Sequence, residues 1–272
     1  MAPRHDRPDL AWRVFVLETV QCLRFYTRLP TPRLAWEMDP HGAPDFSRIP
    51  RMLPVAGAIL GGVGAAALVA ASWIGLPPMA VAAVTLTAQT LATGALHEDA
   101  LADMADGFWG GHTPERRLEI MADSRIGSYG ATALALGLLL RFSAIAGLVA
   151  QAGPGRAALA LVATAAIARV AGLFPLWALS PARPGGKSAS VGRPTDRTMA
   201  TACSITLALA VLLLAPGFGV VKAALALALG GLTAWLCVRL ARAKIGGHTG
   251  DVAGAVTLIA EIAALLGLLT RI

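Results

Sequence analysis

Long apolar runs separated by short polar segments make up most of this chain. Seven of the runs are long enough to cross a bilayer, which takes about 20 residues. The predicted spanning helices cover residues 54–73, 78–96, 130–150, 157–179, 201–218, 221–238 and 252–270. The pattern therefore predicts an all-α polytopic integral membrane bundle of about seven transmembrane helices, built as one membrane domain over residues 1–272.

The segment before the first run has a different pattern. Residues 8–28 mix apolar side chains such as Leu10 and Trp12 with charged ones such as Arg13 and Glu18. The segment has no long apolar core followed by a small-residue cleavage site, so it does not resemble a secretion signal. We predict an amphipathic helix that lies in the membrane interface.

The composition supports a membrane protein and excludes several other classes. Hydrophobic residues make up 56% of the chain and charged residues only 14%, against about 25% in soluble domains. A soluble fold of this size could not cover so much apolar surface with polar side chains, and a disordered chain would be far more polar. The three scattered cysteines, Cys22, Cys203 and Cys237, exclude a disulfide scaffold.

The net charge of +7 is distributed unequally among the polar segments. The first 51 residues and the loops 97–129, 180–200 and 239–251 hold 18 basic residues, whereas the other side holds three. Cytoplasmic loops of membrane proteins carry an excess of Lys and Arg. The predicted topology therefore has the N-terminus in the cytoplasm and the C-terminus outside, and no nucleic-acid partner is expected.

Acidic residues concentrate in the motif His97-Glu-Asp-Ala-Leu-Ala-Asp-Met-Ala-Asp-Gly107. On a helix, Asp99, Asp103 and Asp106 share one face, and their like charges repel one another. Mg²⁺ prefers hard oxygen ligands and usually binds water and substrate phosphate oxygens as well. Its positive charge would relieve this repulsion. The three aspartates are therefore candidate metal ligands and catalytic residues. A solvated acidic helix is the competing interpretation, but residues 97–114 lack the Lys or Arg that it would interleave.

His97 lies two residues before this acidic face. It is the candidate general base, or a group that orients a substrate hydroxyl. A neutral structural hydrogen bond is the other interpretation of the same residue.

The acidic motif is followed by a second polar stretch within a predicted cytoplasmic loop of short helices, residues 97–129. We predict a short helix at 114–122 with Thr113 as its N-cap. Asp123 and Arg125 come next and are candidate substrate-binding residues. Arg125 could hold a phosphate with both arms of its guanidinium, or it could pair with Asp123 or contact an anionic lipid.

Two glycine-rich loops on the same side complete the candidate site. Arg183 and Lys187 lie in a basic, glycine-rich loop that suits an anionic ligand, although it lacks the spacing of a P-loop. The loop before the last span presents three further substrate-binding candidates, His248, Thr249 and Asp251. Metal-binding acids combined with phosphate-binding bases favour transfer of a phosphate-linked group.

Glu261 is an acid ten residues inside the last span. An acid at that depth is costly and is a functional hypothesis unless it is a purely structural pair. We expect Arg141 or Arg169, which lie within other spans, to be its partner.

The motifs resemble those of the cobalamin synthase (adenosylcobinamide-GDP ribazoletransferase) family of coenzyme B12 assembly. Besides the acidic motif, the matching segments are Arg24-Phe-Tyr-Thr-Arg-Leu-Pro30, Glu119-Ile-Met-Ala-Asp-Ser-Arg-Ile-Gly-Ser-Tyr-Gly130 and Gly246-Gly-His-Thr-Gly-Asp-Val-Ala-Gly-Ala255. They run in family order over nearly the whole chain. Ala100 stands where the family usually has Gly, and His248 where it often has Gln.

The resemblance implies an enzyme of the bacterial inner membrane with Mg²⁺ as cofactor. Such an enzyme joins adenosylcobinamide-GDP to α-ribazole or its 5′-phosphate, and forms adenosylcobalamin or its 5′-phosphate with GMP. Its partners are these small molecules and the lipid bilayer, together with a second copy of the chain and other late cobalamin-assembly enzymes. The active site is expected to face the cytoplasm.

Combining the resemblance with the residues gives each candidate a role. Asp99, Asp103 and Asp106 would hold Mg²⁺ on the diphosphate. Asp123 and Asp251 would ligate a second metal or orient substrate. Arg125, Arg183 and Lys187 would stabilise the charge of the diphosphate.

Two other functions compete with this one. A CDP-alcohol phosphotransferase of lipid synthesis also places aspartates at the end of a span, but its pattern of Asp-x2-Asp-Gly-x2-Ala-Arg differs from the spacing of four and three found here. An ion-coupled transporter would carry acids and broken helices near the middle of the bilayer. Here the acids lie in predicted loops, apart from Glu261.

Overall fold

The computed structural model describes residues 8–37, 39, 44–183 and 192–271, and it describes side chains from residue 12 onward. In chain order the helices are α1 (Pro8–Tyr26), η1 (Ile49–Met52), α2 (Leu53–Trp73), α3 (Pro78–Thr93), α4 (Leu96–Gly110), α5 (Pro114–Met121), α6 (Ser128–Ala152), α7 (Pro154–Ala178), α9 (Asp196–Phe218), α10 (Val220–Ile245) and α11 (Gly250–Leu268). The described ranges contain no β-strand, which confirms the all-α prediction.

Six of the described helices are long and apolar enough to cross a membrane. They are α2 together with η1, and α6, α7, α9, α10 and α11. A seventh crossing is obtained when α3 and α4 are counted as one span that is bent by 85°. The prediction of a polytopic helical membrane protein is confirmed.

The bend between α3 and α4 corrects the predicted span 78–96. Gly94 and Ala95 adopt left-handed backbone conformations with φ of 64° and 59°, and both N–H groups donate to carbonyls of the last turn of α3. Left-handed residues close a helix in this way, although for an alanine the conformation costs roughly 1–2 kcal/mol. The chain then restarts as α4, so the expected loop 97–129 begins with a 15-residue helix that lies outside the six spans.

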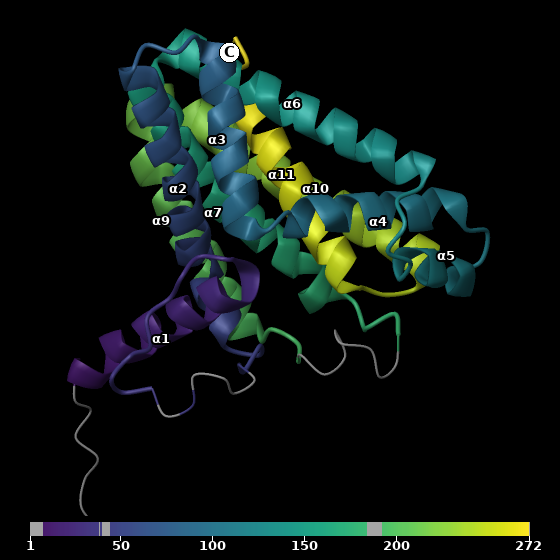
Figure 1. Cartoon of the computed structure of the whole chain (residues 1–272). Coiled ribbons are helices and arrows are strands. Elements are labelled where there is room, and N and C mark those ends of the chain that lie inside the picture. The colour runs from purple at the N-terminus through teal and green to yellow at the C-terminus, as the bar shows by residue number, and fades with distance from the viewer. Residues whose placement is uncertain (1–7, 38, 40–43, 184–191, 272) are drawn as a thin grey trace, which may run out of the picture.

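α7 forms the centre of the bundle and is buried along most of its length. α2 packs closely against it, and Figure 1 shows α2, α7 and α9 running side by side. A Cβ atom on Gly57 would lie 2.8 Å from the carbonyl oxygen of Ala165, and one on Gly61 would lie 2.6 Å from that of Leu161. These two glycines therefore serve helix packing within the chain.

α4 crosses α11 and α6, and α5 folds back against it (Figure 1). The approach of α4 to α11 is close, because a Cβ atom on Gly254 would lie 2.5 Å from the Cβ of Ala100. This contact places the acidic helix beside the first turn of α11.

α1 lies at a steep angle to α2 and α9, at the end of the bundle opposite the C-terminal end of α11 (Figure 1). It exposes large apolar side chains, with Trp12 49%, Phe15 42% and Phe25 50% exposed. An exposed apolar face is typical of an interfacial helix. The predicted helix at residues 8–28 is therefore present, and its place in the membrane interface stays a prediction.

Candidate active site

Three carboxylates, two from α4 and one from α11, lie close enough to Asp103 in the middle of α4 to act on its charge. Asp103 is half-buried, and burial together with three neighbouring carboxylates raises the pKa of Asp103 to about 7. In order of effect, those carboxylates belong to Asp99, Asp251 and Asp106. The structure thus brings Asp251, from the first turn of α11, to the acidic face that the spacing predicted.

Asp106 holds a different position from its two neighbours on α4. It is buried, and its two oxygens accept backbone N–H groups from Gly127 at 2.7 Å and Gly130 at 2.8 Å. A Cβ atom on Gly127 would lie 2.5 Å from Asp106 Oδ1, so both glycines are needed for this approach. Asp106 therefore fixes the start of α6 on α4 and has both oxygens engaged.

His97 points into the bundle rather than along the acidic face. It is 5% exposed, and burial, followed by the charges of Arg169 and Arg141, lowers the pKa of His97 well below its usual value. The imidazole is therefore neutral at physiological pH. The structure separates this candidate base from the carboxylates that surround Asp103.

A buried ionic network anchors α4 to the spanning helices. Arg141 of α6 donates to Glu98 at 3.0 Å, to Glu261 at 3.1 Å and to Gln89 at 3.1 Å. The prediction that Arg141 or Arg169 pairs with Glu261 is confirmed for Arg141. The sequence analysis assigned no role to Glu98. Its position on the apolar side of α4 could have indicated that its side chain points into the bundle.

The loop before α11 is joined to the segment that follows α7. The N–H of Ala182 donates to the His248 carbonyl at 2.9 Å, and the N–H of His248 donates to the Ser180 carbonyl at 2.9 Å. This bridge brings Arg183 near the start of α11, where its charge acts on the Asp251 carboxylate. Lys187 lies outside the described residues.

The side chains of His248 and Thr249 shape this loop. His248 is buried, and burial, followed by the charge of Arg193, lowers the pKa of His248. Thr249 caps α11 by accepting the Val252 N–H at 3.2 Å, and its hydroxyl donates to Asp251 at 3.3 Å. Thr249 thus helps to position Asp251, whereas the imidazole of His248 is buried in the loop and its Nδ1 has no hydrogen-bond partner among the described residues.

Hydrogen bonds from two arginines hold α5 in place. Arg117 donates to the carbonyl of Gly111 at 3.0 Å and to that of Lys244 at 2.8 Å, which joins α5 to the end of α10. Arg183 donates to the Leu118 carbonyl. The predicted helix at 114–122 is confirmed as α5, with Thr113 as its N-cap.

Asp123 and Arg125 pair with each other at the surface. Their ion pair spans 2.6 Å, and hydrogen bonds from Arg125 lower the pKa of Asp123 to about 2. Both residues line a cavity of about 290 Å³ that also reaches Asp106 and Arg116. The sequence left three partners open for Arg125: a phosphate, Asp123 and an anionic lipid. In the structure, Arg125 pairs with Asp123.

The donor set around Asp103 fits Mg²⁺ in chemistry. Carboxylate oxygens are the ligands this ion prefers, and it usually takes only one or two of them and fills its shell with water and substrate phosphates. In the described part of the chain, no three His, Cys, Asp or Glu side chains are placed so that together they could hold a metal ion. The mutual repulsion felt by Asp103 is the force that a cation would relieve.

Residues 18–269 match the family model described as cobalamin-5-phosphate synthase. The chain belongs to this family. A curated relative from Azorhizobium caulinodans, an adenosylcobinamide-GDP ribazoletransferase, is 49% identical over 91% of this chain and 93% of its own. Relatives of the same name from Brucella ovis and Brucella canis are each 43% identical over 92% of this chain and 95% of theirs. No solved structure matches the chain.

Family membership confirms the function predicted from the motifs and decides against the two alternatives. The broken pair α3–α4 and the buried network around Arg141 are features that a transporter would also contain. In this chain the bend brings the acidic helix to the first turn of α11, and the network holds that helix in place.

Proposed function

We propose that this enzyme joins adenosylcobinamide-GDP to α-ribazole or its 5′-phosphate, and releases adenosylcobalamin or its 5′-phosphate together with GMP. The curated relatives are named for the ribazoletransferase activity. The structural observation that carries the proposal is the gathering of Asp99, Asp251 and Asp106 around Asp103. Because the diphosphate and these carboxylates are both negatively charged, the diphosphate can bind beside the carboxylates only when a cation lies between the two.

Mg²⁺ would be held by one or two of the carboxylates of Asp99, Asp103 and Asp251, and water and diphosphate oxygens would fill the rest of its shell. When bound, it would neutralise diphosphate charge and polarise the phosphate under attack. Asp106 has a structural role beside these carboxylates, because its oxygens accept the N–H groups of Gly127 and Gly130 and so join α4 to the start of α6. A second ion, or substrate orientation, remains the proposed role of Asp123.

In the reaction, the ribazole hydroxyl oxygen forms a bond to the phosphorus attached to cobinamide. The bond from that phosphorus to the bridging oxygen breaks, GMP leaves with the electron pair, and the hydroxyl proton passes to solvent or to a site carboxylate. His97 is buried away from this face and is not placed to accept the proton. In-line phosphoryl transfer depends mainly on positioning and charge neutralisation, which the acids and bases of the loops supply.

Basic residues would neutralise the rest of the diphosphate. Arg183 is fastened to α5 and acts on Asp251, so its guanidinium borders the acids. Lys187 follows in the same glycine-rich loop. Arg125 stands with Asp123 at the rim of the neighbouring cavity, where a bidentate phosphate contact would replace the ion pair.

The membrane orientation is part of the proposal. The unequal distribution of basic residues favours a bacterial inner membrane protein with the site on the cytoplasmic side. Figure 1 is consistent with it, since the C-terminal end of α11 lies at the far end of the bundle from α1. A homo-oligomer and other late cobalamin-assembly enzymes are its proposed protein partners.

The direct test is release of GMP by the purified chain in detergent. We expect GMP to form only when adenosylcobinamide-GDP, α-ribazole and Mg²⁺ are all present, and to stop when a chelator is added. α-Ribazole 5′-phosphate in place of α-ribazole identifies the preferred acceptor. Folded protein that releases no GMP with either acceptor would overturn the proposal.

A further inference from the structure

A second polar cavity is lined by residues at η1 and at the start of α9. α1, which packs against η1, lies at the other side of the bundle from α4 and α5 (Figure 1). Its volume is about 410 Å³, and none of its lining residues belongs to the acid site. Three arginines line it, Arg48, Arg51 and Arg197, together with hydroxyl side chains and one carboxylate, Asp45.

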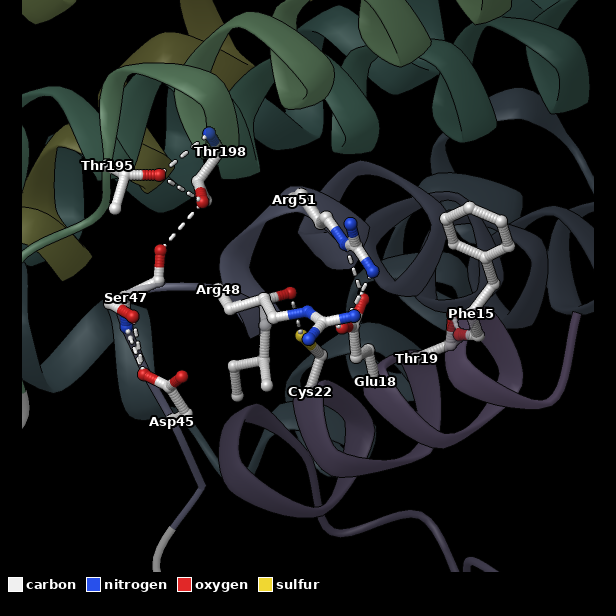
Figure 2. Close-up of polar contacts among 11 residues, drawn as sticks. Phe15, Glu18, Thr19, Cys22, Asp45, Ser47, Arg48, Arg51, Thr195 and Thr198 are labelled. Carbon is white, nitrogen blue, oxygen red and sulfur yellow. Dashed lines mark hydrogen bonds and ion pairs between the residues drawn. The ribbon is translucent and has the colours of Figure 1, made fainter. Parts of the chain in front are cut away.

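Figure 2 shows how two of the arginines are arranged around a buried carboxylate. Glu18 of α1 is 4% exposed. It accepts hydrogen bonds from Arg51 at 2.6 and 2.8 Å and forms an ion pair with Arg48 at 3.0 Å. One carboxylate thus serves two guanidiniums, and the side chain of Arg48 remains 56% exposed.

The remaining donors of the arginines are open to a ligand. Among the described residues, the two terminal nitrogens of Arg48 and the Nη1 of Arg51 donate no hydrogen bond. The guanidinium of Arg197 likewise makes no ion pair with a described residue. Asp45 is engaged by Ser47, which donates to it from both its N–H and its hydroxyl. The cavity therefore presents more positive charge than its own carboxylates neutralise.

The backbone that carries Arg48 and Arg51 is held from two sides (Figure 2). On one side, the Cys22 thiol of α1 donates to the carbonyl of Ile49 at 3.4 Å. On the other side, the Ser47 carbonyl accepts from the Thr198 hydroxyl at 2.6 Å and from the Thr195 N–H at 3.2 Å. Arginines fixed in this way lose little conformational freedom when they bind a ligand.

The start of α9 adds to the attraction for an anion. Thr195 caps this 23-residue helix by accepting the Thr198 N–H at 3.1 Å. The earlier N–H groups of the first turn have no intrahelical acceptor, and the helix dipole makes this end positive. The acid in the same turn, Asp196, is turned to Trp177, whose indole N–H donates to it at 2.8 Å.

We propose that this cavity binds a phosphate ester, with Arg48 and Arg197 as its main ligands. Guanidinium groups match the oxygens of a phosphate in geometry and charge. The exposed apolar face of α1 borders the cavity through Phe15, whose ring lies under Arg51 at 5.1 Å, which favours the headgroup of an anionic membrane lipid. The phosphate of a soluble nucleotide has the same chemistry and is the other source.

The test measures binding to the delipidated full-length chain by native mass spectrometry and by thermal shift. The probes are dioctanoyl-phosphatidylglycerol, dioctanoylglycerol, which lacks the phosphate, and GMP. We expect the phosphatidylglycerol to bind and stabilise the chain, and dioctanoylglycerol to do neither. The double variant Arg48→Gln/Arg197→Gln should weaken the binding about tenfold or more, since two charge-assisted contacts are lost.

Arg156→Gln is the matched control, because Arg156 is an exposed arginine in the first turn of α7, outside the cavity. It should bind like the parent chain. Arg197→Gln alone keeps the test valid if the double variant misfolds, since Arg197 makes no ion pair with a described residue. GMP competing with the lipid would support the proposal and name a soluble source. Equal binding by the parent chain and the Arg197 variant, or no binding of either phosphate ester, would overturn it.

Discussion

Asp103 is the residue at which the electrostatics of the acid site converge. Its carboxyl is half-buried and faces three others, two from its own helix and one from α11. A carboxyl in this environment holds a proton near neutral pH unless a cation takes its place. The same crowding that is unfavourable in the free chain therefore prepares the site for a metal–diphosphate complex.

The first prediction concerns the charge of Asp103. Asp103→Asn keeps the size of the side chain but removes a metal ligand, so GMP release should fall by about 100-fold or more. The control is Glu115→Gln, an exposed position in the first turn of α5, which should keep parental activity. Near-normal turnover by a folded Asp103→Asn protein would remove Asp103 from the proposed metal site.

The second prediction concerns pH. The folded-state pKa of Asp103 is raised to about 7 from an ordinary value of 3.8. The stability that its proton contributes is therefore complete below the ordinary value and is lost as the pH rises toward and through about 7. Without metal, the Tm of the parent chain should fall relative to that of Asp103→Asn between about pH 4 and about pH 7 and change little above that range.

Mg²⁺ should restore the Tm of the parent chain at the upper end of this range and change it little at the lower end, where protons compete with the metal. Thermal unfolding in detergent, with and without Mg²⁺, measures both effects. A Tm difference between the two proteins that stays constant with pH would contradict the assignment.

At the scale of elements, the site depends on how α4 meets α6 and α11. α4 reaches α11 through the contact of Ala100 with Gly254 and holds α6 through Asp106. The bend at Gly94 and Ala95 sets the direction of α4. Small residues at the crossings allow these helices to approach so closely that carboxylates and backbone N–H groups meet directly.

The third prediction tests the junction of α4 with α6. A Cβ atom at Gly130 would overlap Asp106 Oδ2 and would lie 2.8 Å from the Ala102 carbonyl. Gly130→Ala should therefore destabilise the protein by about 1–3 kcal/mol and lower GMP release. Gly155→Ala is the control, since Gly155 also lies in the first turn of a helix and has open space around it. Equal Tm values for the two variants would show that the junction tolerates a side chain.

At the scale of the whole molecule, the bundle places an ionic network in its interior and two polar sites at its surface. The network around Arg141 joins α3, α4, α6 and α11, so it holds together segments that are far apart in sequence. The acid site lies on one side of this core, and the arginine cavity lies by α1 and α9 on the other (Figure 1). The interior thus acts as a rigid support for the surface chemistry.

The fourth prediction concerns this network. Arg141→Gln leaves the buried carboxylates of Glu98 and Glu261 without their cation, which should cost about 3–5 kcal/mol of stability. Adding Glu261→Gln to the same chain should recover part of the loss, because one buried charge is removed. Thermal unfolding of both variants against Arg156→Gln measures the effect. A single variant as stable as this surface control would contradict the structural role.

The sequence by itself determined the class of the fold and the location of the acids. Apolar runs of spanning length are a local property, since each helix must bury its own backbone in lipid. The spacing of Asp99, Asp103 and Asp106 likewise needs only the period of a helix. The Thr113 cap and the family motifs are local signals of the same kind.

Only the tertiary structure decided what each polar residue meets. The bend at Ala95 depends on a left-handed backbone that hydropathy does not record. It turns His97 and Glu98 inward and brings α4 against Asp251, about 150 residues further along the chain. Contacts between distant segments arise from packing of the whole bundle, which the pattern of one helix does not contain. The sequence therefore predicted the chemistry of the acid site, whereas the packing of α4 against α6 and α11 decided its geometry.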